Sequence, residues 1–124
     1  MIVDFFKKID KITGKDPRYK PDAYEFVMES LWFTQKSLNR NNHVTGRELL
    51  NGIREYGLEQ YGPMTKMVLE HWGITRTEDF GEIVFNMVEN GLMGRSESDS
   101  RDDFKNIYDF KDAFDSKRQF GINK

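Results

Sequence analysis

Basic side chains gather at the N-terminal end of the sequence, where they could contact a polyanion. Residues 1–20 contain six basic and three acidic side chains, with one tyrosine among them. Lysine and arginine can contact phosphate groups, and a tyrosine ring can stack on a base. The candidate nucleic-acid surface consists of Lys7, Lys8, Lys11, Lys15, Arg18, Tyr19 and Lys20. The alternative interpretation is a solvated helix face followed by a basic connector.

Acidic side chains gather later in the chain. Residues 75–103 carry three arginines and no lysine against eight Asp and Glu residues. The candidate surface for a protein partner consists of Arg76, Glu78, Glu82 and Asp99, and it would suit a basic partner because opposite charges attract across an interface. The same acidity disfavours contact between the helix expected over 77–90 and double-stranded DNA, which carries a dense line of phosphates.

Metal and catalytic chemistry have little support in the residue pattern. His43 and His71 stand far apart, and the acidic run 97–103 departs from a calcium-binding loop because Arg101 takes a ligand position and the turn glycine is missing. There is no cysteine, no nucleophile elbow and no phosphate-binding glycine loop. Asp79 and Glu82 share a helix face, where the helix dipole explains them. The sequence therefore predicts no catalytic residue, cofactor or metal, and a small enzyme using pocket carboxylates stays a second alternative.

The central stretch 44–93 must position most of these side chains, and its pattern predicts three helices. Thr45 followed by Glu48 is typical of a capping box at a helix start. Gly62 and Pro63 end this first helix, and Gly73 ends the second in a left-handed conformation. Thr77 is the expected N-cap of the third helix, whose apolar face runs to residue 88.

The flanking segments complete a mainly α-helical single domain, 1–124. Periodic apolar residues predict a helix over 2–13, followed by a connector to residue 20, and a second helix from Pro21 to about Leu38. Residues 92–96 and 104–110 read as two short strands around the acidic loop, and 116–124 as a frayed tail. Helices followed by a C-terminal β-hairpin give a winged-helix-like order.

Composition limits the class of protein further. The chain carries a net charge of −2 with 32% charged residues, and it has no apolar run long enough to span a bilayer and no signal-peptide pattern. We therefore expect a cytoplasmic protein that makes no membrane contact. Aromatic residues make up 14% of the chain, and a surplus beyond what one core can bury would favour a protein–protein interaction module. The alternative interpretation is tight internal packing of these rings. Whether Trp32 and Trp72 belong to the core or to an interface stays open, as does the oligomeric state.

Several motifs together resemble a small family of bacterial proteins to which no function is assigned. The resemblance rests on DPRY at 16–19, HVTGRELLNGIRE at 43–55, GEIVFNMVENGL at 81–92 and YDF at 108–110. It covers residues 16–114, most of the chain. The resemblance implies a bacterial, single-domain, cytoplasmic protein, and it implies no catalytic residue, cofactor or partner.

Overall fold

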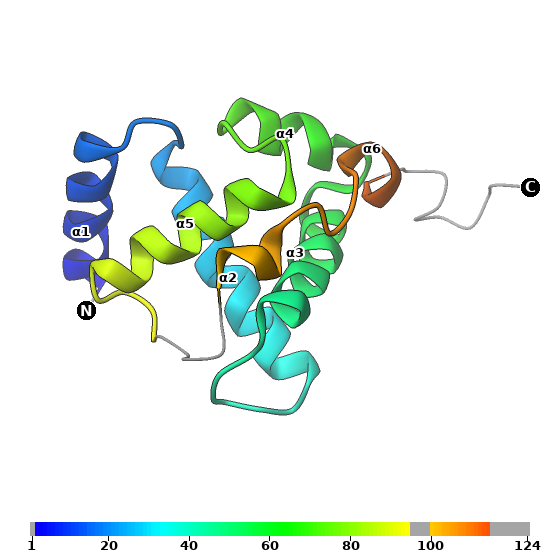
Figure 1. The fold of residues 1–124 in the computed structure, drawn as a ribbon, viewed down its shortest axis with the longest axis horizontal. Coiled ribbons are helices and arrows are strands. Elements are labelled where there is room, and N and C mark those ends of the chain that lie inside the picture. Colours follow the sequence, from blue (N-terminus) through cyan, green and yellow to red (C-terminus); the bar gives the residue numbers. More distant parts are fainter. Residues whose placement is uncertain (1, 95–99, 115–124) are drawn as a thin grey trace, which may run out of the picture.

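The computed structural model describes residues 2–94 and 100–114, which form helices joined by short connections with no β-strand among them (Figure 1). The mainly α-helical class is confirmed. The helices are α1 (Ile2–Lys15), α2 (Pro21–Ser37), α3 (Gly46–Tyr61), α4 (Thr65–His71), α5 (Thr77–Glu89) and α6 (Phe110–Ala113), and the 3₁₀ turns are η1 (Gly62–Met64) and η2 (Arg101–Phe104).

Helix α2 lies at the centre of the arrangement. It packs along α3, and α5 crosses it, while α1 lies at one end of the molecule and α6 at the opposite end (Figure 1). The α2–α3 approach depends on a glycine, because a Cβ on Gly52 would lie 1.6 Å from the Thr34 hydroxyl oxygen. That hydroxyl donates to the Ser30 carbonyl at 2.7 Å, so the contact is ordered and buried.

Aromatic rings fill much of the core. Tyr24 and Phe80 are fully buried, and Trp72, at 9% exposure, packs against Phe26 and Tyr61 with ring centroids 5.6 and 5.9 Å away. Trp72 is therefore a core residue. Trp32 is not, because 59% of it is exposed.

The predicted boundaries of the central helices are mostly confirmed. The Thr45–Glu48 capping box is present, and Gly73 has φ 94° at the end of α4. The N-cap of α5 was predicted wrongly, because the helix begins at Thr77 itself. The Asp79 carboxylate accepts the backbone N–H groups of Thr75 and Arg76, so it supplies the cap.

The predicted C-terminal β-hairpin and its winged-helix order are wrong for the described residues. Residues 101–104 form a 3₁₀ turn and residues 110–113 a short helix. The Thr77 hydroxyl donates to the Phe104 carbonyl at 2.6 Å and accepts the Ile107 N–H at 3.1 Å, and Glu78 accepts the Asn106 N–H at 3.1 Å. These side chains of α5 take the backbone groups that a second strand would have needed. The predicted tail, 116–124, lies outside the described residues.

No helix in the described ranges is both long enough and apolar enough to cross a membrane.

Candidate functional site

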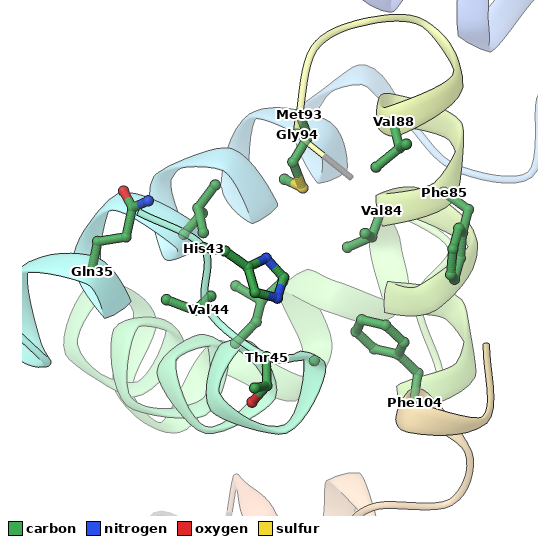
Figure 2. A pocket seen from close by; sticks show the side chains of 13 residues that line it. Gln35, His43, Val44, Thr45, Val84, Phe85, Val88, Met93, Gly94 and Phe104 are labelled. Atoms are coloured by element: carbon green, nitrogen blue, oxygen red, sulfur yellow. The ribbon is translucent and has the colours of Figure 1, made fainter. Parts of the chain in front are cut away.

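A pocket with a cavity volume of about 250 Å³ opens between α2, the start of α3 and α5 (Figure 2). Three parts of the chain far apart in sequence form its walls. The lining residues are Leu31, Gln35, His43, Val44, Thr45, Gly46, Leu49, Val84, Phe85, Val88, Met93, Gly94 and Phe104.

The two sides of the pocket differ in chemistry. On the α5 side, Val84 and Val88 lie on consecutive turns with Phe104 below them. Phe85 also borders the pocket, but its ring points away from His43 and has the Arg101 guanidinium 5.2 Å from its centroid. The opposite side carries polar groups from the segment before α3. Figure 2 shows the imidazole of His43 lying between this segment and the apolar wall of α5. The side opposite α5 also carries hydrocarbon from Leu31, Val44 and Leu49, so polar and apolar groups are mixed there.

The polar side is held in place by the cap of α3. Glu48 accepts the Thr45 N–H at 2.8 Å and Thr45 accepts the Glu48 N–H at 3.1 Å. Arg40 also forms an ion pair with Glu48. The Thr45 N–H, with Arg40 beside it, lowers the pKa of the Glu48 carboxyl below its ordinary value. Gln35 of α2 donates from its amide nitrogen to the Asn42 carbonyl at 2.9 Å, which ties the same connection to α2.

The floor of the pocket needs two glycines. The Phe104 ring is buried against α3 and α5, where a Cβ on Gly46 would lie 3.2 Å from the ring edge. A Cβ on Gly81 would lie 3.0 Å from Cβ of Phe104. Only residues without a side chain allow Phe104 to come this close to both helices.

Trp32 lies beside the pocket on the same helix. It follows the lining residue Leu31 and precedes Gln35 by three positions, and residues three apart are neighbours on a helix surface. Trp32 does not itself line the pocket, but it is a large exposed ring on the helix that supplies Leu31 and Gln35 to the lining.

The predicted partner surface lies at the start of α5, and its acids make contacts inside the molecule. Glu82 pairs with Arg18 at 3.3 Å and with Arg101 at 3.3 Å. Glu78 accepts the Asn106 N–H, as described above. Arg76 is exposed, and Asp99 lies outside the described residues. Glu78 and Glu82 thus already bind groups of their own chain.

The segment 16–19 forms a polar network with α5. Asp16 accepts two hydrogen bonds from the Arg18 guanidinium, at 2.9 and 2.7 Å, and a third from Asn86 at 3.0 Å. Arg18 holds the pKa of the Asp16 carboxyl well below its ordinary value. Tyr19 donates its hydroxyl to Asp79 at 2.6 Å, and burial together with this carboxylate raises the pKa of the Tyr19 hydroxyl.

This network removes two residues from the predicted nucleic-acid surface. Arg18 is paired with acids, and Tyr19, at 2% exposure, has no ring face available for stacking. The exposed members that remain are Lys7, Lys8, Lys11, Lys15 and Lys20. Steps of four residues place Lys7, Lys11 and Lys15 along one edge of α1, with Lys8 next to them.

The residues considered for metal binding and for carboxylate chemistry are not brought together in the described part of the chain. They contain no group of three or more His, Asp or Glu side chains able to hold a metal ion. Asp79 and Glu82 do not line the pocket, and both are engaged by other side chains.

Comparisons with protein-family models, with curated proteins and with solved structures find no match for this chain. A function must therefore be argued from its own geometry.

Two apolar runs in the sequence are wider than one helix face, and helical periodicity alone did not separate their core residues from their pocket residues. Leu31, Trp32 and Phe33 are consecutive, so a helix cannot bury all three on one face. Likewise, Ile83, Val84 and Phe85 extend around α5 beyond one core-facing stripe. Apolar stripes wider than one face indicate a second contact surface, but they do not say that a cavity lies between them.

Proposed function

We propose that this protein is a non-enzymatic protein-binding module that docks its partner on the surface formed by the pocket and Trp32. The single observation that carries the proposal is a tryptophan with 59% of its surface exposed, next in sequence to Leu31, which lines an open pocket. Tryptophan is enriched among residues that dominate binding energy, and such residues work best beside a pocket that excludes water.

The pocket supports docking of a side chain better than it supports catalysis. Phe85, Val88 and Met93 are only half-buried, so hydrocarbon surface is left for a partner to cover. No Asp or Glu lines the cavity, so the carboxylate chemistry considered as an alternative has no acid there. The proposal requires no cofactor, no metal and no winged-helix topology. It places the module in the cytoplasm, with which the mixed charge and the absence of cysteine agree, and in a bacterium, as the resemblance described above implies.

A capture experiment tests this function. The tagged chain is exposed to lysate of its host with nuclease present, and captured proteins are measured for wild type, Trp32→Ala and Met67→Ala. Met67 is the matched control, because it is 60% exposed but lies on α4, away from the pocket. We expect Trp32→Ala to lower capture of a stoichiometric partner at least about tenfold, as for a hot-spot residue. Equal capture by wild type and Trp32→Ala would contradict the proposal.

A second candidate function is nucleic-acid binding through the lysine edge of α1, defined as Lys7, Lys8, Lys11 and Lys15. What favours it is their common edge and full solvent access, with no ion pair to any of them recorded in the described residues. With Tyr19 buried, contact would be limited to phosphates and would not depend on base sequence.

Salt dependence tests this second function quantitatively. If all four lysines contact phosphates, the affinity for duplex DNA should fall with salt at a log–log slope of about −3.6. Each Lys→Gln change on the edge should reduce the slope by about one. Lys36→Gln, on the exposed part of α2, should leave it unchanged. A slope near zero would exclude the function.

A further inference from the structure

We infer that the partner protein docked at Trp32 presents a segment rich in lysine or arginine, which lies along the outward face of α2. This inference rests on the proposed docking function and deepens it, because it names the chemistry of the partner. The outward face of α2 is defined as Asp22, Glu25, Glu29, Trp32 and Lys36. It carries three acids and one base around a large exposed ring.

The outward face of α2 is not covered by the rest of the fold. Steps of four, three and four residues place Glu25, Glu29, Trp32 and Lys36 on one line along the helix. All are exposed except Glu29, which is half-buried. The buried residues of α2 lie on its other faces, where α3 and α5 pack: Ala23, Tyr24, Phe26, Val27, Met28, Ser30 and Thr34. The line is therefore free to contact another protein.

The three acids of this face lie close enough together to act on one hydroxyl. Burial, and after it the charges of Glu29, Asp22 and Glu25, raise the pKa of the Tyr61 hydroxyl. Glu29 also accepts the Tyr56 hydroxyl at 3.0 Å. In the part of the chain that the structure describes, no lysine or arginine forms an ion pair with any of the three. Their negative charge is thus left for a partner to neutralise.

The acids of α5 differ in this respect. Glu82 pairs with Arg18 and Arg101, and Glu78 accepts the Asn106 N–H. A basic partner would have to displace these groups from α5, whereas at α2 it would displace only water. Attraction between opposite charges therefore favours the acids of α2 as the docking surface.

Trp32 attracts the same kind of group as the acids do. The face of an indole ring attracts a lysine ammonium or an arginine guanidinium more strongly than the other aromatic rings do. Glu29 precedes Trp32 by three positions, so the two side chains are neighbours on the helix surface. A basic side chain placed here would contact a carboxylate and an exposed aromatic ring together, with its carbon chain lying on the ring.

The distribution of charge also gives the docked segment a direction. The acids occupy the N-terminal half of α2, and Lys36 lies near its C-terminal end. The basic residues of the partner should therefore lie over the N-terminal half. Apolar residues of the partner should follow beyond Trp32, where Leu31 and Gln35 line the pocket.

Two helical peptides test the inference on the intact chain. One repeats leucine and lysine in an amphipathic pattern, and the other has glutamate in place of every lysine. Affinity is measured by isothermal titration calorimetry, and amide NMR shifts locate the contact. We expect the lysine peptide to bind and to shift the amides of Glu25, Glu29 and Trp32. Failure of the lysine peptide to bind, or equal or tighter binding of the glutamate peptide, would overturn the inference.

Charge variants show where the lysine peptide binds. Glu25→Gln, Glu29→Gln should lower its affinity about fivefold or more, as expected for two exposed ion pairs. Glutamine at position 29 still accepts the Tyr56 hydroxyl, so the fold is kept. The matched control, Asp10→Asn, Asp112→Asn, removes two exposed negative charges from α1 and α6, at opposite ends of the molecule (Figure 1). An equal loss in both double variants would show an effect of net charge alone and would overturn the inference.

Ionic strength separates the charged contacts from the contact of the ring. Raising it from about 0.1 M to about 1 M shortens the screening length from about 10 Å to about 3 Å. The wild type should then bind the lysine peptide no more tightly than Glu25→Gln, Glu29→Gln does. Trp32→Ala should lower the affinity at both ionic strengths, and Met67→Ala should leave it unchanged. An affinity of the wild type that did not fall with salt would contradict a docking surface made of acids.

The inference and the docking function fail in different ways. If the lysine peptide binds equally with and without Glu25 and Glu29, but Trp32→Ala lowers capture of a partner from lysate, the docking function stands and the basic partner falls. If the peptide needs both acids, but Trp32→Ala captures as much partner as wild type does, the acids bind a basic segment and the docking function falls.

Discussion

The two sides of α5 contact the rest of the molecule in different ways. On one side, Asp79 and Asn86 hydrogen-bond to the segment 16–19, and Glu82 joins two arginines. On the other side, Val84, Phe85 and Val88 border a cavity that the described chain does not fill. We call the first the tied side of α5 and the second the pocket side.

The difference separates residues that hold the fold from residues available for binding. Every carboxylate on the tied side has a partner within its own chain, so its chemistry is used in stability. The pocket side presents the hydrocarbon of Val84 and Val88 to the cavity. From charge alone, the acids of α5 were predicted to bind a partner, because they were the conspicuous feature of the sequence. Whether a charged group already has a partner matters more for function than its presence does.

The largest effect should come from Asp79→Ala on the tied side. The change removes the acceptor of the Tyr19 hydroxyl and of two N–H groups at the start of α5. Loss of a cap costs about 1 kcal/mol, and a buried donor left unsatisfied costs about 1–3 kcal/mol. We expect the free energy of unfolding to fall by about 2–4 kcal/mol, measured by urea denaturation. Glu89→Ala, an exposed acid at the other end of α5, should change it by less than about 0.5 kcal/mol.

A smaller loss of folding stability should follow from Gly81→Ala, a change at the contact between α5 and the floor of the pocket. The new Cβ would press on Phe104, so the floor of the pocket would have to move. Overpacking of this kind costs about 1–3 kcal/mol. Gly14→Ala is the control, because nothing lies within 4 Å of its added Cβ, and there alanine should stabilise α1 by up to about 1 kcal/mol. If Gly81→Ala proves as stable as wild type, Phe104 is not fixed and the pocket is not preformed.

The sequence was informative where local chemistry decides structure. The Thr45–Glu48 cap and the left-handed Gly73 each depend on residues close in sequence, and both are confirmed. Long-range hydrogen bonds could not be read in this way. Thr77 appeared as an N-cap, yet its hydroxyl bonds the backbone at Phe104 and Ile107, some 27 and 30 residues away.

The same limit applies to the buried face of α4. Met64 and Met67 have the spacing of an apolar helix face but are exposed, whereas Thr65 and Leu69 are buried. The 3₁₀ turn η1 changes the periodicity before α4, and the Thr65 hydroxyl lies 2.9 and 2.7 Å from the carbonyls of Gly57 and Gly62. A pocket depends on such offsets between several elements, so its lining could be predicted only in part.

A moderate, pH-dependent effect should come from Asp16→Asn on the tied side. Arg18 lowers the pKa of the Asp16 carboxyl in the folded protein. The stability that Asp16 contributes is therefore fully present above the unfolded pKa of about 3.9 and is lost as pH falls towards the folded pKa. We expect the variant to be about 1 kcal/mol less stable at pH 7, as for a good surface pair. The difference from wild type should narrow below about pH 4, measured by urea midpoints. A gap between variant and wild type that widened in acid would contradict this interpretation.

The smallest effect should come from neutralising the acids that the sequence offered as a partner surface. The double variant Glu78→Gln, Glu82→Gln keeps an acceptor for the Asn106 N–H but removes the charge that pairs with Arg18 and Arg101. Both arginine side chains are more than half exposed, so each pair should contribute less than about 1 kcal/mol to stability. If the pocket side carries binding, partner capture by this variant should equal that of wild type, while Trp32→Ala loses it. Capture lost in the charge variant and kept in Trp32→Ala would reverse the assignment of the two sides, because the partner would then compete with Arg18 and Arg101 for the acids of α5.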